Sequence, residues 1–195
     1  MWSVLDIAVD AERGVLWASS AALPYFKNYN AEKDLGKFGI FKFDLKTGKL
    51  ISRYSSIENA QGEAFYPKGL VLGADGEVYV SNALGRGIYQ IRDDKFKRIL
   101  QLPMMTGISA ITMSGDGKLL YMADPGLGLI GLDVTTLKPF DVLVPPKLTL
   151  EGITGLHWTD KGLVVIQGGM SPKRIMGFGL SPKGDTIVDF KPIES

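Results

Sequence analysis

Four segments of the chain repeat one pattern of apolar and polar positions. Each has a short apolar run, a turn that contains aspartate and closes on glycine, and a second apolar run that ends in small or polar residues. Short apolar runs bounded by turn residues predict β-strands, so each segment predicts a β-hairpin. The segments are VLDIAVDAERGVLWASS (4–20), PKGLVLGADGEVYVSNA (67–83), GISAITMSGDGKLLYMADP (107–125) and GITGLHWTDKGLVVIQGG (152–169).

A second hairpin pattern follows each of these segments. Its strands alternate polar and apolar residues, which half-buried strands do. The first strand of each repeat is more uniformly apolar, and we expect it to be covered on both faces. The second hairpins are GIFKFDLKTGKLISRY (39–54), GIYQIRDDKFKRILQL (87–102), LIGLDVTTLKPFDVLV (129–144) and RIMGFGLSPKGDTIVDF (174–190).

The repeat length predicts the fold class. The turn glycines of the first hairpins follow one another at spacings of 62, 41 and 45 residues. Four strands in a period of about 40–45 residues are typical of β-propeller blades. A meander sandwich of similar hairpins is the alternative, and four copies in phase favour the propeller. We therefore predict a single all-β domain over residues 1–195, with four four-stranded blades at about 4–55, 65–102, 107–145 and 151–191. A partial six-bladed propeller, an open arc and a small ring all stay open.

Composition and net charge exclude several classes of binding partner. The chain of 195 residues is 45% hydrophobic, which suffices for one core, and its formal net charge of +1 favours neither nucleic acid nor an anionic membrane. No apolar stretch approaches the roughly 20 residues of a membrane helix, and Asp6 and Asp10 interrupt the first apolar run, unlike in a signal peptide. The absence of cysteine excludes disulfides and thiolate chemistry. We expect a soluble protein of unassigned compartment, without nucleic-acid or membrane partners.

The segments PKGLVLGADGEVYVSNA, SAITMSGDGKLLYMADP and FDLKTGKL resemble the senescence marker protein/gluconolactonase family of six-bladed propellers. The resemblance spans nearly the whole chain and implies a member about two blades short, either a short member or a fragment. It also implies metal-dependent hydrolysis of lactones and organophosphates. The family's divalent cation, usually calcium, is held at the mouth of the central channel by a Glu, two Asn and an Asp, which are oxygen ligands suited to hard cations.

The resemblance places the family's ligands at the starts of the innermost strands. Leu5 cannot bind a cation, and the ammonium group of Lys68 would repel one, so we expect the family's metal site to be incomplete. No cofactor is certain, and Ca²⁺ or another divalent cation is allowed. The positions that match the ligands are Leu5, Lys68, Ser109 and Thr154, and the weak metal candidates are Asp6, Asn82, Asp124 and Glu151.

Propeller geometry locates the candidate site. Loops that enter first strands and loops that leave second strands emerge on one face, opposite the Asp-Gly turns. At this face Lys68 either contacts an anion or is solvated or paired with Glu63 or Asp6. Asn82 and Asp124 either accept hydrogen bonds from loop backbone or contact a ligand. The candidate ligand contacts are Lys68, Ser109, Thr154, Asn82, Asp124, Gln167, Tyr25 and Phe26.

Two further features bear on the site. The segment 20–38 is the longest irregular insertion, and long loops are often functional. Its aromatic residues, Tyr25 and Phe26 among them, either cover the channel mouth or hold the loop against the first blade. His157 is the only histidine, and we expect it to be buried and hydrogen-bonded.

Three functions remain after these observations. The first is a propeller that binds a small molecule or a partner at its channel mouth without the family's complete metal site. The second is a calcium-type, metal-dependent lactonase or related hydrolase. The third is an assembly module whose open sheet edges pair with another chain.

Overall fold

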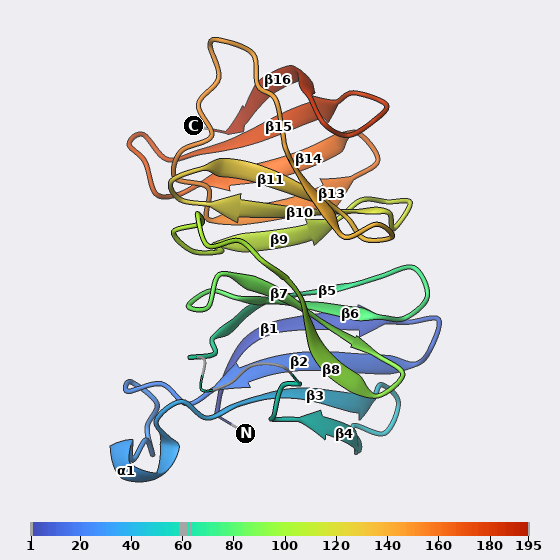
Figure 1. Cartoon of the computed structure of the whole chain (residues 1–195), viewed down its shortest axis with the longest axis vertical. Helices are drawn as coiled ribbons and strands as arrows, with labels where there is room; N and C mark the ends of the chain where they lie inside the picture. Colours follow the sequence, from blue (N-terminus) through green and yellow to red (C-terminus); the bar gives the residue numbers. More distant parts are fainter. Residues whose placement is uncertain (1, 59–61, 63, 195) are drawn as a thin grey trace. The chain divides into compact units, whose positions relative to one another are not determined.

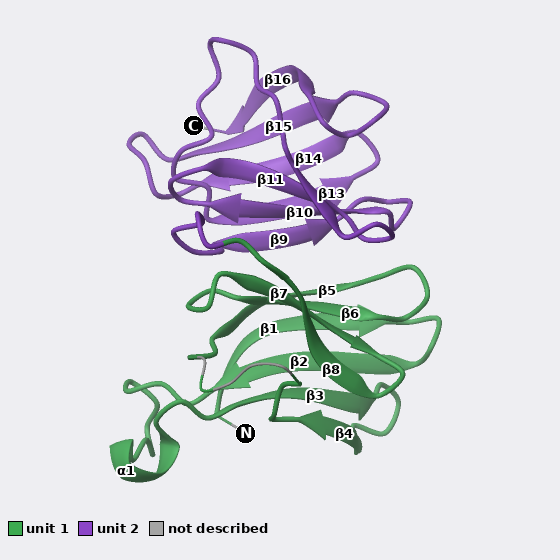
Figure 2. Cartoon of the chain, in the orientation of Figure 1, with its two compact units in different colours: residues 1–102 green, residues 103–195 purple. Residues whose placement is uncertain are grey.

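The computed structural model describes residues 2–58, 62 and 64–194 and confirms the predicted all-β propeller fold with four blades. Each blade is an antiparallel four-stranded sheet whose strands follow one another in chain order (Figure 1). The chain divides into two compact units, residues 1–102 and 103–195, with two blades in each (Figure 2).

The first unit contains blades 1 and 2. Blade 1 consists of β1 (Ser3–Asp10), β2 (Val15–Ala21), β3 (Phe38–Asp44) and β4 (Leu50–Tyr54). Blade 2 consists of β5 (Pro67–Leu72), β6 (Val78–Asn82), β7 (Gly87–Arg92) and β8 (Lys95–Gln101). The predicted insertion lies between β2 and β3 and contains the short helix α1 (Ala31–Asp34), whose first amides are capped by Asn30.

The second unit contains blades 3 and 4. Blade 3 consists of β9 (Ala110–Met113), β10 (Leu119–Asp124), β11 (Gly128–Asp133) and β12 (Lys138–Asp141). Blade 4 consists of β13 (Gly155–Thr159), β14 (Gly162–Gln167), β15 (Arg174–Leu180) and β16 (Ile187–Glu194).

Each unit has its own core at the seam between its two blades. In the first unit β1 lies beside β5, and Trp17 and Ile40 of blade 1 pack with Val80 and Tyr89 of blade 2. In the second unit β9 lies beside β13, and the seam buries residues of both blades, including Tyr121, Ala123, Leu163, Val165, Met176 and Phe178. Alternate residues of each strand point into the seam because successive side chains of a strand lie on opposite faces.

The Asp-Gly turns form as the sequence predicts. Gly76 and Gly117 adopt left-handed backbone angles, with φ of 84° and 69°. Only glycine takes this conformation without a steric cost, so these residues close the tight turns between first and second strands.

The structure corrects one expectation about the first strands. Val4, Ile7 and Val9 of β1 are 49%, 57% and 49% exposed, so β1 is not covered on both faces. Only its other face packs on blade 2, through residues such as Ala8. Apolar composition alone cannot tell a strand with two packed faces from one with an apolar face left open.

Candidate functional site

Two equivalent β-bulges mark the starts of the inner strands in the first unit. Leu5 is the extra residue of β1, between the pairs Val4–Ser20 and Asp6–Ser19. Lys68 is the extra residue of β5, between the pairs Pro67–Asn82 and Gly69–Ser81. A bulge leaves its extra residue outside the ladder and redirects the strand. The two positions at which the resemblance would place metal ligands are therefore structurally equivalent.

Lys68 is exposed at its bulge. Within the described part of the chain its ammonium group forms no ion pair, while Glu63, one of its two predicted partners, lies outside the described residues. The other predicted partner, Asp6, binds backbone instead, accepting hydrogen bonds from the amides of Leu70 (2.8 Å) and Ile7 (2.9 Å). Asp6 thereby joins the inner strands of blades 1 and 2. Burial raises the pKa of its carboxyl group, and these two amide hydrogen bonds offset part of that effect.

The insertion between β2 and β3 lies next to the segment that enters β5. Tyr25, which is exposed, lies close enough to Tyr66, two residues before Lys68, to influence its ionisation. Burial raises the pKa of Tyr66, and the contact with Tyr25 raises it further. Phe26 is half-buried. Tyr25, Tyr66 and Lys68 therefore all lie at the strand-entry end of the first unit.

Asn82 and Asp124 end the second strands of blades 2 and 3, and both are fully buried. The Asn82 side chain accepts from the amides of Tyr66 (2.9 Å) and Leu84 (3.2 Å) and donates to the Ala64 carbonyl (2.9 Å). Backbone hydrogen bonding was one of the two roles considered for this residue. These contacts hold the segment that enters the blade against the end of its second strand.

Asp124 makes the same kind of connection with more donors. Burial raises the pKa of its carboxyl group, but amide hydrogen bonds from Gly107, Leu127 and Gly126 outweigh burial, so the pKa is lowered overall. Thr106 adds its amide (2.7 Å) and its hydroxyl group (3.0 Å). The carboxylate is thus surrounded by donors from the segment that enters β9 and from the loop that follows β10.

Gln167 occupies the corresponding place in blade 4 and is fully buried. Its side-chain amide donates to the carbonyls of Glu151 (2.8 Å) and Thr149 (3.0 Å), and its oxygen accepts from the guanidinium group of Arg174 (2.7 Å). Glu151 is exposed. Three blades therefore use a buried polar side chain at the same place, and a backbone role for Gln167 was not predicted from the sequence.

The remaining candidates of the second unit bind backbone atoms. The Ser109 hydroxyl donates to the carbonyl of Ile153 (2.7 Å) and lies 3.0 Å from that of Ala123, which joins blade 3 to the segment entering β13. The Thr154 hydroxyl accepts from the Gly168 amide (3.3 Å). Of the weak metal candidates, Asp6 and Asn82 belong to the first unit. Among the residues that the structure describes, no three His, Asp or Glu side chains gather where they could hold a metal ion.

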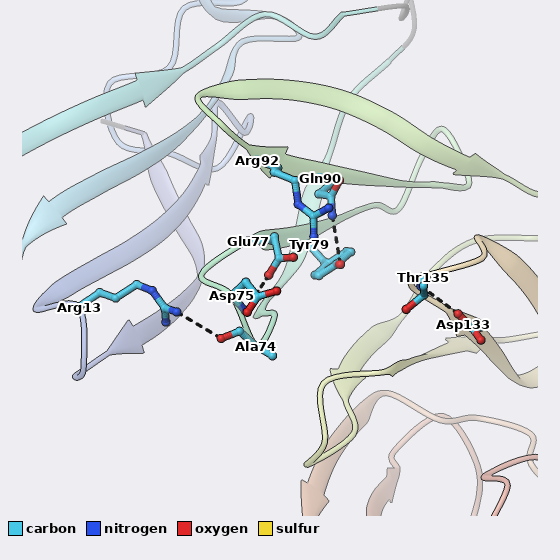
Figure 3. Close-up of polar contacts among 9 residues, drawn as sticks. All are labelled: Arg13, Ala74, Asp75, Glu77, Tyr79, Gln90, Arg92, Asp133 and Thr135. Carbon is cyan, nitrogen blue, oxygen red and sulfur yellow. Dashed lines mark hydrogen bonds and ion pairs between the residues drawn. The ribbon is translucent and has the colours of Figure 1, made fainter.

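A hollow lies at the turn end of the seam between blades 1 and 2, and it was not predicted from the sequence. It measures about 320 Å³, and Trp17, Lys42 and Tyr54 form part of its wall. The Lys42 ammonium lies 5.2 Å from the centre of the Trp17 ring. Across the hollow, Glu77 and Arg92 form an ion pair, next to the hydrogen bond between Gln90 and Tyr79 (Figure 3). No sequence signal marks this hollow, because the pairing of Trp17 with Lys42 depends on the register between β2 and β3.

The prediction for His157 was wrong. Its side chain is exposed in β13, opposite Val164 of β14. The apolar residues around it suggested burial, but the period of two places it on the face that points away from the core of the second unit.

Comparisons with known proteins support the fold class, a β-propeller. No family model and no curated protein matches the chain. Solved structures that it resembles include U3-55K (10% identity, TM-score 0.69, 99% of this chain and 52% of that chain). The WD40 repeats of RRP9 match at 10% identity and a TM-score of 0.68, over 100% of this chain and 52% of that one.

A catalytically inactive virginiamycin B lyase from Staphylococcus aureus, solved with quinupristin, matches at 14% identity and a TM-score of 0.65. It is covered over 56% of its length, and this chain over 100%. The chain therefore spans about half the length of these propellers. Within the described residues, no helix has the length and apolar character needed to cross a membrane.

Proposed function

We propose that this chain is a propeller binding module that takes a small anionic molecule at the strand-entry end of its first unit. The observation that carries the proposal is Lys68, an exposed ammonium group on a β-bulge with no ion-pair partner among the described residues. A carboxylate ligand would provide the opposite charge. Tyr25 and Tyr66 offer hydroxyl groups and ring faces beside it.

The same positions argue against the complete metal site of the gluconolactonase family. A metal ion at the start of β5 would stand next to the Lys68 ammonium, and Leu5 at the equivalent place in β1 has no ligand atom. Hard divalent cations require several oxygen ligands. We therefore propose gluconolactonase-like blades without the family's cation chemistry in this half-propeller.

Gluconate and glucono-lactone are suitable probes because they test the anionic ligand and the family's substrate class together. We expect gluconate to raise the melting temperature, and Lys68→Gln to weaken this binding about tenfold. That loss corresponds to about 1.4 kcal/mol, a typical value for a charged hydrogen bond. Lys46→Gln is the matched control, since Lys46 is exposed in the turn between β3 and β4 of the same unit.

The hydrolase remains the second candidate, supported by the family resemblance alone. Calcium and zinc titrations followed by thermal melting test it, with lactone turnover measured in parallel. A metal-dependent rise in melting temperature together with turnover that Asp124→Ala abolishes would contradict the binding-module proposal. Binding of gluconate that is indifferent to Lys68→Gln would contradict the assigned site.

A further inference from the structure

Blade 1 has an apolar face on the side away from its seam with blade 2. The described residues of the first unit leave Ile7, Val9 and Leu50 of this face about half exposed, whereas Ala18 and Phe41 are buried. Cross-strand pairing places Val9, Leu16, Phe43 and Leu50 in one row of this face. The next row consists of Ile7, Ala18, Phe41 and Arg53. We call these two rows the free face of blade 1.

The free face of blade 1 matches the face with which blade 2 packs on blade 1. Alignment of the two bulges pairs Leu16 with Val78 and Ala18 with Val80. In the next strand it pairs Phe41 with Tyr89 and Phe43 with Ile91. All four residues of blade 2 are buried in the seam core of the first unit. The free face of blade 1 therefore has the composition of a blade seam.

Blade 4 also has a free face, on the side of its sheet opposite to the side that is free in blade 1. It packs on blade 3 through Leu163, Val165, Met176 and Phe178, the counterparts of the rows that are free in blade 1. The other face, which we call the free face of blade 4, carries Val164, Ile175 and the 46% exposed Ile166. Beside them lies a hollow of about 470 Å³, where Gly177 and Gly179 bring no side chains. The two free faces thus correspond to the two sides of one blade seam.

We infer that the free face of blade 1 binds the free face of blade 4 in a second copy of this chain. The chain spans about half of the length of the propellers it resembles, so a second copy would supply a comparable length of chain. Charges agree with this pairing. Arg53 is the charged residue of the rows on blade 1, whereas Asp189, Glu194 and Lys191 give the face of blade 4 a net charge of −1.

Such an interface joins two different patches of the chain, one on each unit, so it is a heterologous contact. This inference does not rest on the proposed anion site. The experiment is sedimentation equilibrium of the full chain in the micromolar range, where we expect twice the mass of one chain or more. A single-chain mass for the unmodified protein would overturn the inference, whatever gluconate does.

Two substitutions test the faces without removing buried groups. Ile7→Lys on blade 1 and Ile166→Lys on blade 4 put a charge at half-exposed positions, and each should weaken association about tenfold or more. Leu84→Lys is the matched control, because Leu84 is 61% exposed in the loop between β6 and β7 and belongs to neither face. Circular dichroism and the urea midpoint establish that each variant is folded.

Mixing the two variants tests which faces meet. Ile7→Lys keeps an intact face on blade 4, and Ile166→Lys keeps an intact face on blade 1, so an equimolar mixture forms one good interface and recovers the mass of two chains. If the faces of blade 1 bound each other, Ile166→Lys alone would stay associated. That result, or a mixture that stays at single-chain mass, would overturn the pairing.

Discussion

At the scale of single residues, the buried side chains at the ends of second strands determine how the blades hold their entering segments. Asp124 is fully buried and accepts amide hydrogen bonds from the segment that enters β9 and from the loop that follows β10. Asp124→Ala would leave several buried amides unpaired, at about 1–3 kcal/mol for each unsatisfied group, so we expect a loss of about 3 kcal/mol in unfolding free energy.

Urea denaturation at neutral pH measures that loss. Asp160→Ala is the control, because Asp160 is exposed in the turn between β13 and β14. We expect the control to change the unfolding free energy by less than about 0.5 kcal/mol, as surface substitutions do. Equal effects of the two variants would contradict the role assigned to Asp124.

Asp6 gives a pH-dependent prediction of definite sign. The pKa of its carboxyl group is raised in the folded protein. Its favourable contribution to the unfolding free energy is therefore present at low pH and is lost as the pH rises through the pKa of the folded state. Asp6→Asn removes this loss and keeps a side-chain oxygen for the Leu70 amide. The unfolding free energy of Asp6→Asn relative to the unmodified protein should therefore increase between pH 3 and 7.

The control for Asp6 has the opposite sign. Hydrogen bonds from the Thr47 side chain and amide lower the pKa of Asp44, whose contribution is therefore present above the unfolded pKa and is lost as the pH falls through the folded one. The unfolding free energy of Asp44→Asn relative to the unmodified protein should therefore decrease as the pH rises. Parallel curves for the two variants would contradict both assignments.

At the scale of strands and blades, Phe65 is the one described buried residue in the core of the first seam that lies outside a strand. It lies in the segment entering β5, with its ring centre 4.3 Å from that of Phe38 and 4.8 Å from that of Tyr89. It is buried, and truncation of such a ring leaves a cavity. Phe65→Ala should lower the unfolding free energy by about 3–5 kcal/mol.

Phe65→Leu distinguishes the effect of lost side-chain volume from that of the aromatic ring. It should lower the unfolding free energy by less than about 1.5–2 kcal/mol, because leucine retains most of the apolar contacts. Chemical denaturation provides both values. Leu35→Ala, at an exposed position of the insertion, is the control. A Phe65→Ala loss no larger than that of the control would contradict the packing described here.

The strands and turns could be predicted from the sequence because each blade repeats the same short-range sequence patterns. The period, the Asp-Gly turns and the place of the insertion followed from turn chemistry and from alternation, which act over a few residues. The bulges at Leu5 and Lys68 could not be predicted, because a bulge is defined by the register between two strands. The same applies to the exposed side of β1 and to His157, whose surroundings depend on which blade lies alongside.

The candidate site was predictable only in part. Lys68 was named from its position in the repeat and Tyr25 from the long insertion, and the structure adds the proximity of Tyr25 to Tyr66. The backbone bonds of Gln167 and the hollow at Trp17 required contacts between distant parts of the chain. Sequence patterns report which residues lie at the end of a strand but not which donors or acceptors surround them.

At the scale of the whole molecule, alkaline pH should destabilise the fold through two tyrosines, one in each unit. Burial, together with the hydrogen bond to Asp94, raises the pKa of Tyr54 to about 12. Burial, together with the charges of Asp116 and Asp185, likewise raises the pKa of Tyr121 to about 12. In the folded protein both pKa values lie above the usual tyrosine value of about 10. The contribution of the two tyrosines to the unfolding free energy is therefore complete below pH 10 and is lost as the pH rises toward 12.

Tyr121→Phe separates this titration from simple loss of stability. The variant loses the hydrogen bond to the Gly184 carbonyl (2.9 Å), which should cost about 1 kcal/mol at neutral pH, but its unfolding free energy should fall less steeply above pH 10. Val165→Ala, which removes buried volume and no titrating group, should shift the curve without changing its slope. Urea denaturation from pH 8 to 11.5, with tyrosinate absorbance followed in parallel, distinguishes the two. If Tyr121→Phe kept the full alkaline slope, ionisation of this tyrosine would not be coupled to unfolding, because stability can depend on pH only where the folded and unfolded states bind protons differently.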